Sequence, residues 1–159
     1  MDKPEIERKW VLPAMPRVTF DRCTSIDQGY LVDELRLRRR VPFPPTAGGA
    51  RHTLTIKRGE SMIRDEWEEP IPAWVFTLLW PHTRGWRLSK LRHVINTPQG
   101  TVEVDEYTGK LAGLVVMEYE AASEQAAEAF VFPEWAQAAE EVTGDSRYSN
   151  AYLAREGKP

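Results

Sequence analysis

The chain has 159 residues, of which 42% are hydrophobic and 28% are charged. This length fits a single domain, 1–159, that buries roughly 70% of its unfolded surface. The composition argues against a disordered chain and against a chain that spans a membrane. The net charge of -3 argues against a general nucleic-acid binder, which normally carries a basic excess. The single cysteine, Cys23, excludes an internal disulfide and a multi-cysteine zinc site.

The first ten residues, MDKPEIERKW, place acidic residues where a secretory signal has a basic start followed by an apolar run. We therefore expect a cytoplasmic protein that has neither a membrane nor a nucleic acid as partner.

Hydrophobic residues recur mostly at every second position, which is the period of strands with two different faces. This period predicts about eight strands, near residues 4–12, 28–32, 34–41, 51–58, 62–68, 86–95, 101–107 and 114–121. Helical spacing predicts four short helices, at 72–80, from Ser123 to Phe130, from Pro133 to Val142 and at 149–156. The predicted fold class is mainly β (α+β): an antiparallel β-barrel with short helices packed outside.

Charged residues share one face of nearly every predicted strand. The first strand carries Glu5, Glu7 and Lys9 on one face, and the later strands repeat the pattern. The later rows are Glu34, Arg36 and Arg38; Thr55 and Lys57; Arg64, Glu66 and Glu68; Lys90 and Arg92; Glu103 and Asp105; Glu118 and Glu120. One such row is typical of a solvent face, but the repetition favours the lumen of a barrel. The opposite arrangement, with apolar faces inside as in a lipid carrier, stays open because the period alone does not decide which face is inside.

A charged lumen indicates a ligand site, because buried charge is costly unless it is paired, hydrated or bound to ions. Basic side chains at several heights suit a long polyanion. Carboxylates beside them would repel that anion unless a divalent cation lay between, and oxygen ligands without Cys or His favour Mg²⁺ or Mn²⁺. The pattern therefore predicts metal-bound phosphate.

The residues also match a family pattern. The run Glu5-Ile6-Glu7-Arg8-Lys9 is an E-x-E-x-K sequence that resembles the signature of the CYTH superfamily, also called triphosphate tunnel metalloenzymes. Further matches follow in the family's order: Gln28-Gly29-Tyr30-Leu31, Glu34-Leu35-Arg36-Leu37-Arg38, Thr55-Ile56-Lys57, Glu66-Trp67-Glu68, Lys90-Leu91-Arg92, Glu103-Val104-Asp105 and Glu118-Tyr119-Glu120. The segment Arg147-Tyr148-Ser149-Asn150 looks like the closing segment of compact bacterial members. The resemblance implies an eight-stranded antiparallel β tunnel that binds a triphosphate with Mg²⁺ or Mn²⁺.

Members of this superfamily include inorganic, thiamine and RNA triphosphatases and some adenylate cyclases, so the fold does not fix the substrate. The length and tail of the chain look most like compact bacterial inorganic triphosphatases. We therefore expect metal-dependent hydrolysis of inorganic triphosphate to orthophosphate and pyrophosphate. An adenylate cyclase, a thiamine or nucleoside triphosphatase, and a non-catalytic polyphosphate-binding module remain alternatives.

The same reasoning assigns roles to individual residues. The first metal candidates are Glu5, Glu7, Glu118 and Glu120, because the first and last strands meet when a barrel closes. The weaker candidates are Glu66, Glu68, Glu103 and Asp105, for which salt bridges are a substantial alternative. The expected phosphate clamp consists of Arg36, Arg38, Lys57, Lys90, Arg92 and Arg147. Arg39, Arg40 and Arg58 are expected on the outside of the barrel.

Two residues are candidates for the catalytic step, in which a water attacks the terminal phosphorus. Lys9 is the expected general base, because neighbouring cations favour the neutral form of a lysine. Tyr30 is expected to share or orient the proton, and a core tyrosine with a satisfied hydroxyl is the alternative. A metal-bound hydroxide is the alternative to Lys9 as the means of activating the water.

Overall fold

Nine strands and three α-helices make up the fold in a computed structural model that describes residues 3–46, 48–58 and 63–159. The strands are β1 (Lys3–Leu12), β2 (Arg22–Val32), β3 (Leu35–Phe43), β4 (Arg51–Arg58), β5 (Ile63–Pro70), β6 (Arg87–Thr97), β7 (Gly100–Tyr107), β8 (Val115–Ala121) and β9 (Glu140–Glu141). The helices are α1 (Ala73–Leu79), α2 (Glu124–Glu128) and α3 (Asn150–Glu156). Short 3-10 helices lie at Trp80–Thr83, Gly109–Leu111, Glu134–Ala136 and Ser146–Tyr148.

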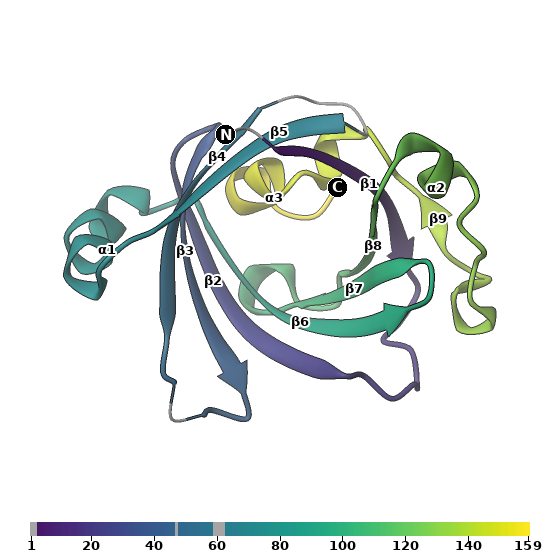
Figure 1. The fold of residues 1–159 in the computed structure, drawn as a ribbon. Helices are drawn as coiled ribbons and strands as arrows, with labels where there is room; N and C mark the ends of the chain where they lie inside the picture. The colour runs from purple at the N-terminus through teal and green to yellow at the C-terminus, as the bar shows by residue number, and fades with distance from the viewer. Residues whose placement is uncertain (1–2, 47, 59–62) are drawn as a thin grey trace.

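The strands pair antiparallel in the order β5-β4-β3-β2-β6-β7-β8-β1-β9 (Figure 1). Strand β1 pairs with β8 through most of its length, and its first residues also pair with β5. Strand β1 therefore joins β8 to β5, which lies at the other end of the strand order. This pairing gives the sheet its tunnel-like shape. This arrangement confirms the predicted mainly antiparallel β fold.

The predicted helix from Pro133 to Val142 is wrong. A 3-10 turn occupies Glu134–Ala136, and the strand β9 follows it. The local sequence favours a helix, but β9 pairs with β1, and the Val142 amide donates to the Lys9 carbonyl. Tertiary contacts with the edge of β1 outweigh helix propensity here.

Most other predicted elements are present with shifted ends. Strand β2 begins at Arg22, well before the predicted start at residue 28, because it pairs with β6 from Arg22 onwards. Helix α2 is capped by the predicted Ser123, whose hydroxyl accepts from the Ala126 amide at 3.1 Å, but it ends at Glu128. The predicted start of the fifth strand, at residue 62, lies outside the described residues.

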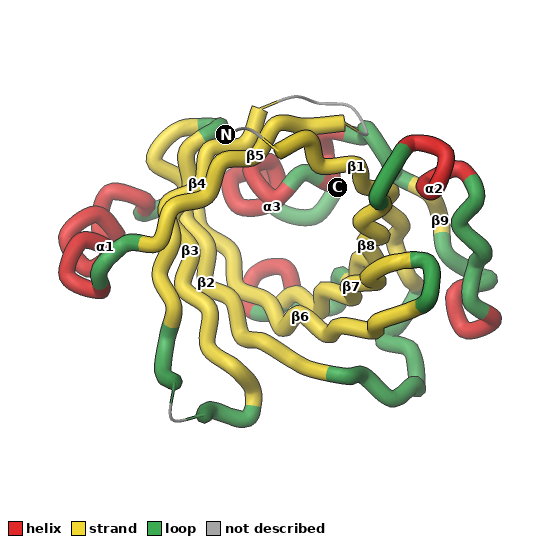
Figure 2. The backbone as a smooth tube through the Cα atoms, viewed as in Figure 1, coloured by secondary structure: helices red, strands yellow, loops and turns green. Residues whose placement is uncertain are grey.

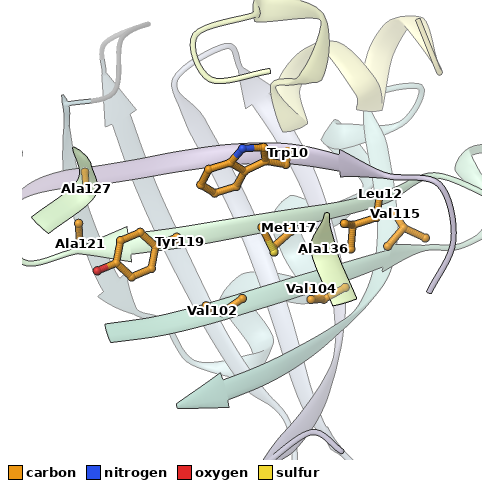
Figure 3. Packing of buried hydrophobic residues seen from close by; sticks show 10 residues of the cluster. All are labelled: Trp10, Leu12, Val102, Val104, Val115, Met117, Tyr119, Ala121, Ala127 and Ala136. Carbon is orange, nitrogen blue, oxygen red and sulfur yellow. The ribbon is translucent and has the colours of Figure 1, made fainter. Parts of the chain in front are cut away.

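A hydrophobic core lies on the outer face of β1, β8 and β7 (Figure 3). Trp10 pairs in register with Met117, which in turn pairs with Val104, so the three side chains share one face of the sheet. Helix α2 and the segment after it cover this face, and the Phe132 ring packs edge-on against Trp10 at 4.9 Å. Because the apolar face is covered from outside, the alternating charged face is the inner one.

Helix α3 differs from the expectation that all helices pack outside. Helices α1 and α2 do lie outside the sheet (Figure 2). In contrast, Leu153 and Ala154 of α3 pack on Leu88 and Val116, which have the inward parity of Lys90 and Glu118. The Trp86 indole also donates to the Ala151 carbonyl at 2.8 Å. The strand ends are apolar at this point, so α3 buries its apolar side there and closes one end of the tunnel.

Among the described residues, no helix combines the length and the apolar character that crossing a membrane requires.

Candidate functional site

The predicted clamp cations come together on the inner face of the tunnel. Residues that pair across antiparallel strands point to the same side, and the register pairs Tyr30 with Arg36, Gln28 with Arg38 and Arg92 with Asp105. The predicted clamp residues on this face are Arg36, Arg38, Lys57, Lys90 and Arg92, and the predicted base Lys9 lies on the same face. The prediction of one shared charged face therefore agrees with the structure.

Two arginines lie elsewhere than expected. Arg40 was predicted outside, which is wrong: it shares the parity of Arg38 and contacts Glu68 at 3.0 Å and Thr53 at 3.1 Å. The even spacing from Arg36 was already sufficient to assign it to the inner face. Arg147 is not placed in this cluster, since its exposed guanidinium contacts Asp145 at 2.6 Å. Arg39 and Arg58 are exposed, as predicted.

The deepest part of the site is an ion cluster around the fully buried Asp105. Its carboxylate accepts from Lys90 Nζ at 2.5 Å and from the Arg92 guanidinium in two contacts of 2.7 Å. Burial acts to raise the pKa of Asp105, but the two cations outweigh it and the pKa is lowered. Burial also lowers the pKa of Lys90 to about 8, against the opposing effect of Asp105. This group holds its charge only because the partners are in contact.

Glu118 connects this buried cluster to Lys9. It lies 2.9 Å from Arg92 and 3.1 Å from Lys9 Nζ. Burial acts to raise the pKa of Glu118, but Lys9 and Arg92 hold it well below its ordinary value. Glu103 contacts Arg92 as well, yet burial dominates and its pKa is raised. The charged partners of Lys9 are thus carboxylates, Glu118 and Glu7, and not the cations that the prediction assumed.

A second group of ion pairs surrounds Lys57 in a less buried part of the lumen. Lys57 Nζ contacts Glu5, lies 3.5 Å from Glu66 and lies 3.6 Å from Glu7. Glu66 also accepts from Arg36 at 3.2 Å. Burial acts to raise the pKa of Glu66, but Arg36 and Lys57 outweigh it and lower the pKa. The weaker metal candidates Glu66, Glu68, Glu103 and Asp105 all contact lumen cations.

The first metal candidates lie on neighbouring strands, as expected. Glu7 pairs in register with Glu120, and Lys9 pairs with Glu118, so β1 and β8 contribute adjacent carboxylates. Within the described ranges, however, no group of three or more His, Cys, Asp or Glu side chains is arranged to hold a metal. The donor set fits Mg²⁺ or Mn²⁺ in kind, because all of its members are carboxylates. In the structure, Lys9 lies between Glu7 and Glu118, and Lys57 lies between Glu5 and Glu7.

A cavity of about 440 Å³ opens beside the charged face. One wall consists of tunnel residues: Glu7, Lys9, Tyr30, Asp33, Glu34, Arg36 and Lys57. The other wall is the segment that runs from Val142 into α3, which includes Thr143, Asn150 and Tyr152.

The sequence assigned no site role to this second wall beyond Arg147. Lys9 Nζ donates to the Tyr148 carbonyl at 3.4 Å, and the Tyr107 hydroxyl donates to Asn150 Oδ1 at 2.6 Å. In the sequence, only the resemblance of residues 147–150 to a family segment pointed to this wall. It did not predict where the segment lies relative to the strands.

Comparison with known proteins agrees with this architecture. No family model matches the chain. The chain is 37% identical over 156 residues to an inorganic triphosphatase from Nitrosomonas europaea, covering 94% of this chain and 96% of that protein. It is 41% identical over 154 residues to an inorganic triphosphatase from Acetivibrio thermocellus, covering 95% and 93%. The crystal structure of an inorganic triphosphatase superposes with a TM-score of 0.66 at 34% identity, covering 98% and 97%.

An antiparallel tunnel with an inner face of paired carboxylates and cations is the architecture of the CYTH superfamily. The chain belongs to the inorganic triphosphatase family within it, as the full-length similarity shows. The predicted resemblance is therefore confirmed, and the chain is an enzyme of the hydrolase class.

Proposed function

We propose that the chain hydrolyses inorganic triphosphate to orthophosphate and pyrophosphate with Mg²⁺ or Mn²⁺ bound beside the substrate. The observation that carries this proposal is the row of basic side chains along one face of the tunnel, three of which, Lys9, Arg36 and Lys57, line the cavity. Guanidinium and ammonium groups at successive positions match a chain of linked phosphates. The family relatives named inorganic triphosphatases support the same substrate.

Binding requires an exchange of partners. In the structure, carboxylates hold the cations: Glu5 contacts Lys57, and Glu66 contacts Arg36. Phosphate oxygens replace these carboxylates on Arg36 and Lys57, and Glu5 and Glu7 turn toward the divalent cation as oxygen ligands. Together with Glu118 and Glu120 they would hold the divalent cation, and Glu68, Glu103 and Asp105 would keep the other cations of the inner face in place. The cation, when bound, neutralises phosphate charge and orients the substrate.

Hydrolysis then needs a positioned water and the acceptance of one proton. The water oxygen forms a bond to the terminal phosphorus, the bond from that phosphorus to the bridging oxygen breaks, and pyrophosphate leaves. We assign the proton to Lys9, whose side chain lies on the cavity wall beside Tyr30. Glu118 and Glu7 hold the Lys9 amine at that wall before the divalent cation binds. When these carboxylates turn to the divalent cation, Lys9 loses its anionic partners and lies beside a positive charge, which favours the neutral amine that accepts the proton.

The test is a substrate panel with the purified chain. Triphosphate, thiamine triphosphate, ATP and pyrophosphate are each assayed with Mg²⁺, with Mn²⁺ and with a chelator. We expect equal amounts of orthophosphate and pyrophosphate from triphosphate, and no turnover with the chelator. Cyclic AMP formation from ATP, a higher kcat/KM for thiamine triphosphate, or triphosphate binding without turnover would each overturn the proposal.

A further inference from the structure

A buried glutamine joins two residues of the proposed phosphate site. The Gln28 side chain is fully buried on the inner face of β2, with 0% exposure. Its Oε1 accepts from Arg38 Nε at 2.9 Å, and its Nε2 donates to the Tyr30 hydroxyl at 2.6 Å. A buried amide with both ends paired is a fixed part of its surroundings, because losing one partner costs the full desolvation of the other group.

The chemistry of Arg38 fixes which way this amide points. A guanidinium carries only donors, so the group that faces Arg38 Nε must be the amide oxygen of Gln28. The NH₂ group of the same amide is then directed at the Tyr30 hydroxyl. That hydroxyl therefore accepts a hydrogen bond from Gln28, and its own proton has to point elsewhere.

The direction left to that proton is the cavity. Tyr30 lines the cavity wall, and in the described part of the chain its hydroxyl has a donor, Gln28, and no hydrogen-bond acceptor. On that wall Lys9 and Arg36 can only donate. The carboxylates of the same wall are bound to cations: Glu7 to Lys9 and Lys57, Glu34 to Arg58, and Asp33 to Arg155. A phosphate oxygen in the cavity supplies the acceptor that the hydroxyl lacks.

Two contacts prevent the strand and the ring from moving away. A Cβ at Gly29, between the two residues, would lie 2.6 Å from Thr83 Oγ1, so β2 is pressed closely against the 3-10 turn outside it. The Tyr30 ring stacks on Trp86 at 5.5 Å, and Trp86 is itself bonded to α3. The hydroxyl is thus held at one place and in one orientation.

We propose that Gln28 is a positioning residue that turns the Tyr30 hydroxyl into a dedicated hydrogen-bond donor to the phosphate undergoing attack. This inference rests on the proposed triphosphatase function. It assigns Tyr30 the donor role in place of a shared proton, and it gives a function to Gln28, which does not itself line the cavity. A donor already aimed at a developing negative charge lowers the barrier without reorganisation.

The test reverses the direction of the hydrogen bond. In Gln28→Glu the introduced carboxylate keeps the shape and the Arg38 contact but accepts the Tyr30 proton, so the donor to phosphate is lost. We expect kcat to fall about 10- to 100-fold, with KM changed much less, both in this variant and in Tyr30→Phe. The double variant should lose no more than either single variant, because both changes remove one interaction. Gln28→Met, which frees the hydroxyl to rotate, should lose less than Gln28→Glu.

The controls separate this role from a purely structural one. Gln125→Glu makes the same change on exposed α2 and should leave kcat unchanged. If Gln28 only supported the fold, Gln28→Met would be at least as harmful as Gln28→Glu, and the Tyr30→Phe and Gln28→Glu losses would multiply. Either result overturns the proposal. A wild-type chain that binds triphosphate but does not hydrolyse it refutes the proposed function instead. In that case the inference about Gln28 is tested by calorimetry. Gln28→Glu and Tyr30→Phe should weaken triphosphate binding equally, and unequal losses of affinity overturn the inference.

Discussion

The inner face of the tunnel has two stretches with opposite chemistry. On β6 the inward residues change from Arg92 and Lys90 to Leu88, and on β8 they change from Glu118 to Val116. Other charged residues of the inner face, Glu7, Arg36 and Lys57, line the cavity, whereas the apolar stretch is covered by Leu153 and Ala154 of α3. The strands continue with the same parity through both stretches, so the difference lies in the side chains alone.

The two stretches contribute to the enzyme in different ways. Ion pairs in the charged stretch give little net stability, because the desolvation of both partners offsets their attraction. These ion pairs keep the cations charged inside the tunnel, where phosphate oxygens can replace the carboxylates as their partners. The apolar stretch supplies burial that stabilises the fold and holds α3, which carries one wall of the cavity. Binding thus depends on the charged stretch, and the position of the cavity wall depends on the apolar stretch.

The largest expected effect concerns Lys9 in the charged stretch. Lys9→Met should lower kcat for triphosphate by about 10² to 10⁴, with a smaller change in KM, because a general base acts in the chemical step. Steady-state kinetics on wild type and variant measure both parameters. A raised KM with an intact kcat would make Lys9 a phosphate ligand, and a metal-bound hydroxide would then be the better candidate for activating the water.

Asp105 tests whether the buried charges depend on their partners. Asp105→Asn leaves Lys90 and Arg92 without their shared carboxylate and should lower the free energy of unfolding by about 3–5 kcal/mol. Urea denaturation gives the value. The matched change Asp33→Asn, at a carboxylate that is 73% exposed, should stay within about 0.5 kcal/mol. Equal losses in both variants would show that burial of the ion cluster carries no special cost.

Leu153 tests the apolar stretch. Leu153→Ala should cost about 2–5 kcal/mol, because the side chain is fully buried against the inner ends of the strands. Leu78→Ala in α1, a helix of the same length, removes a side chain that is 63% exposed and should cost less than about 0.5 kcal/mol. A small loss for Leu153 would mean that α3 is not anchored by this contact.

The smallest expected effect lies outside the tunnel, where the Arg8 guanidinium donates to Glu141 at 2.8 and 2.9 Å and connects β1 to β9. The Arg8 hydrogen bond lowers the pKa of Glu141 below its ordinary value of 4.5. A lowered pKa in the folded state means that this stabilisation is present above the ordinary pKa and is lost as the pH falls through the folded-state value.

Because Glu141 is partly exposed, solvent reduces the contribution of this pair to about 0.2–1 kcal/mol. Glu141→Gln should therefore destabilise the chain slightly at neutral pH, and the difference from wild type should disappear in acid. Urea denaturation at both pH values tests this, and a difference that grows in acid would contradict it.

The sequence was sufficient to predict the charged face because strand period is a local property. Spacing alone assigned Glu7, Lys57 and Glu118 to the charged faces of their strands, and the family resemblance was needed to expect those faces inside a tunnel. Spacing carries no information about where along a strand the site ends. It therefore did not predict that the inner face of β6 becomes apolar between Lys90 and Leu88. The pairing of Glu140 with β1 and the docking of Leu153 depend on contacts between distant segments, which local propensity does not contain. The hydrogen bonds of Gln28 likewise require the register of β2 with β3.

Adjacent residues of β4 provide the most direct test of the central claim that the inner face binds triphosphate. Lys57 points into the lumen with its side chain 17% exposed, whereas Arg58 points outward with its side chain 68% exposed. Lys57→Met should weaken triphosphate binding about 10- to 100-fold in calorimetry, because the contact between the Lys57 ammonium and a phosphate oxygen is lost. Arg58→Met should leave triphosphate binding nearly unchanged. Equal losses from the two variants, or a larger loss from Arg58→Met, would contradict the assignment of the lumen as the binding site.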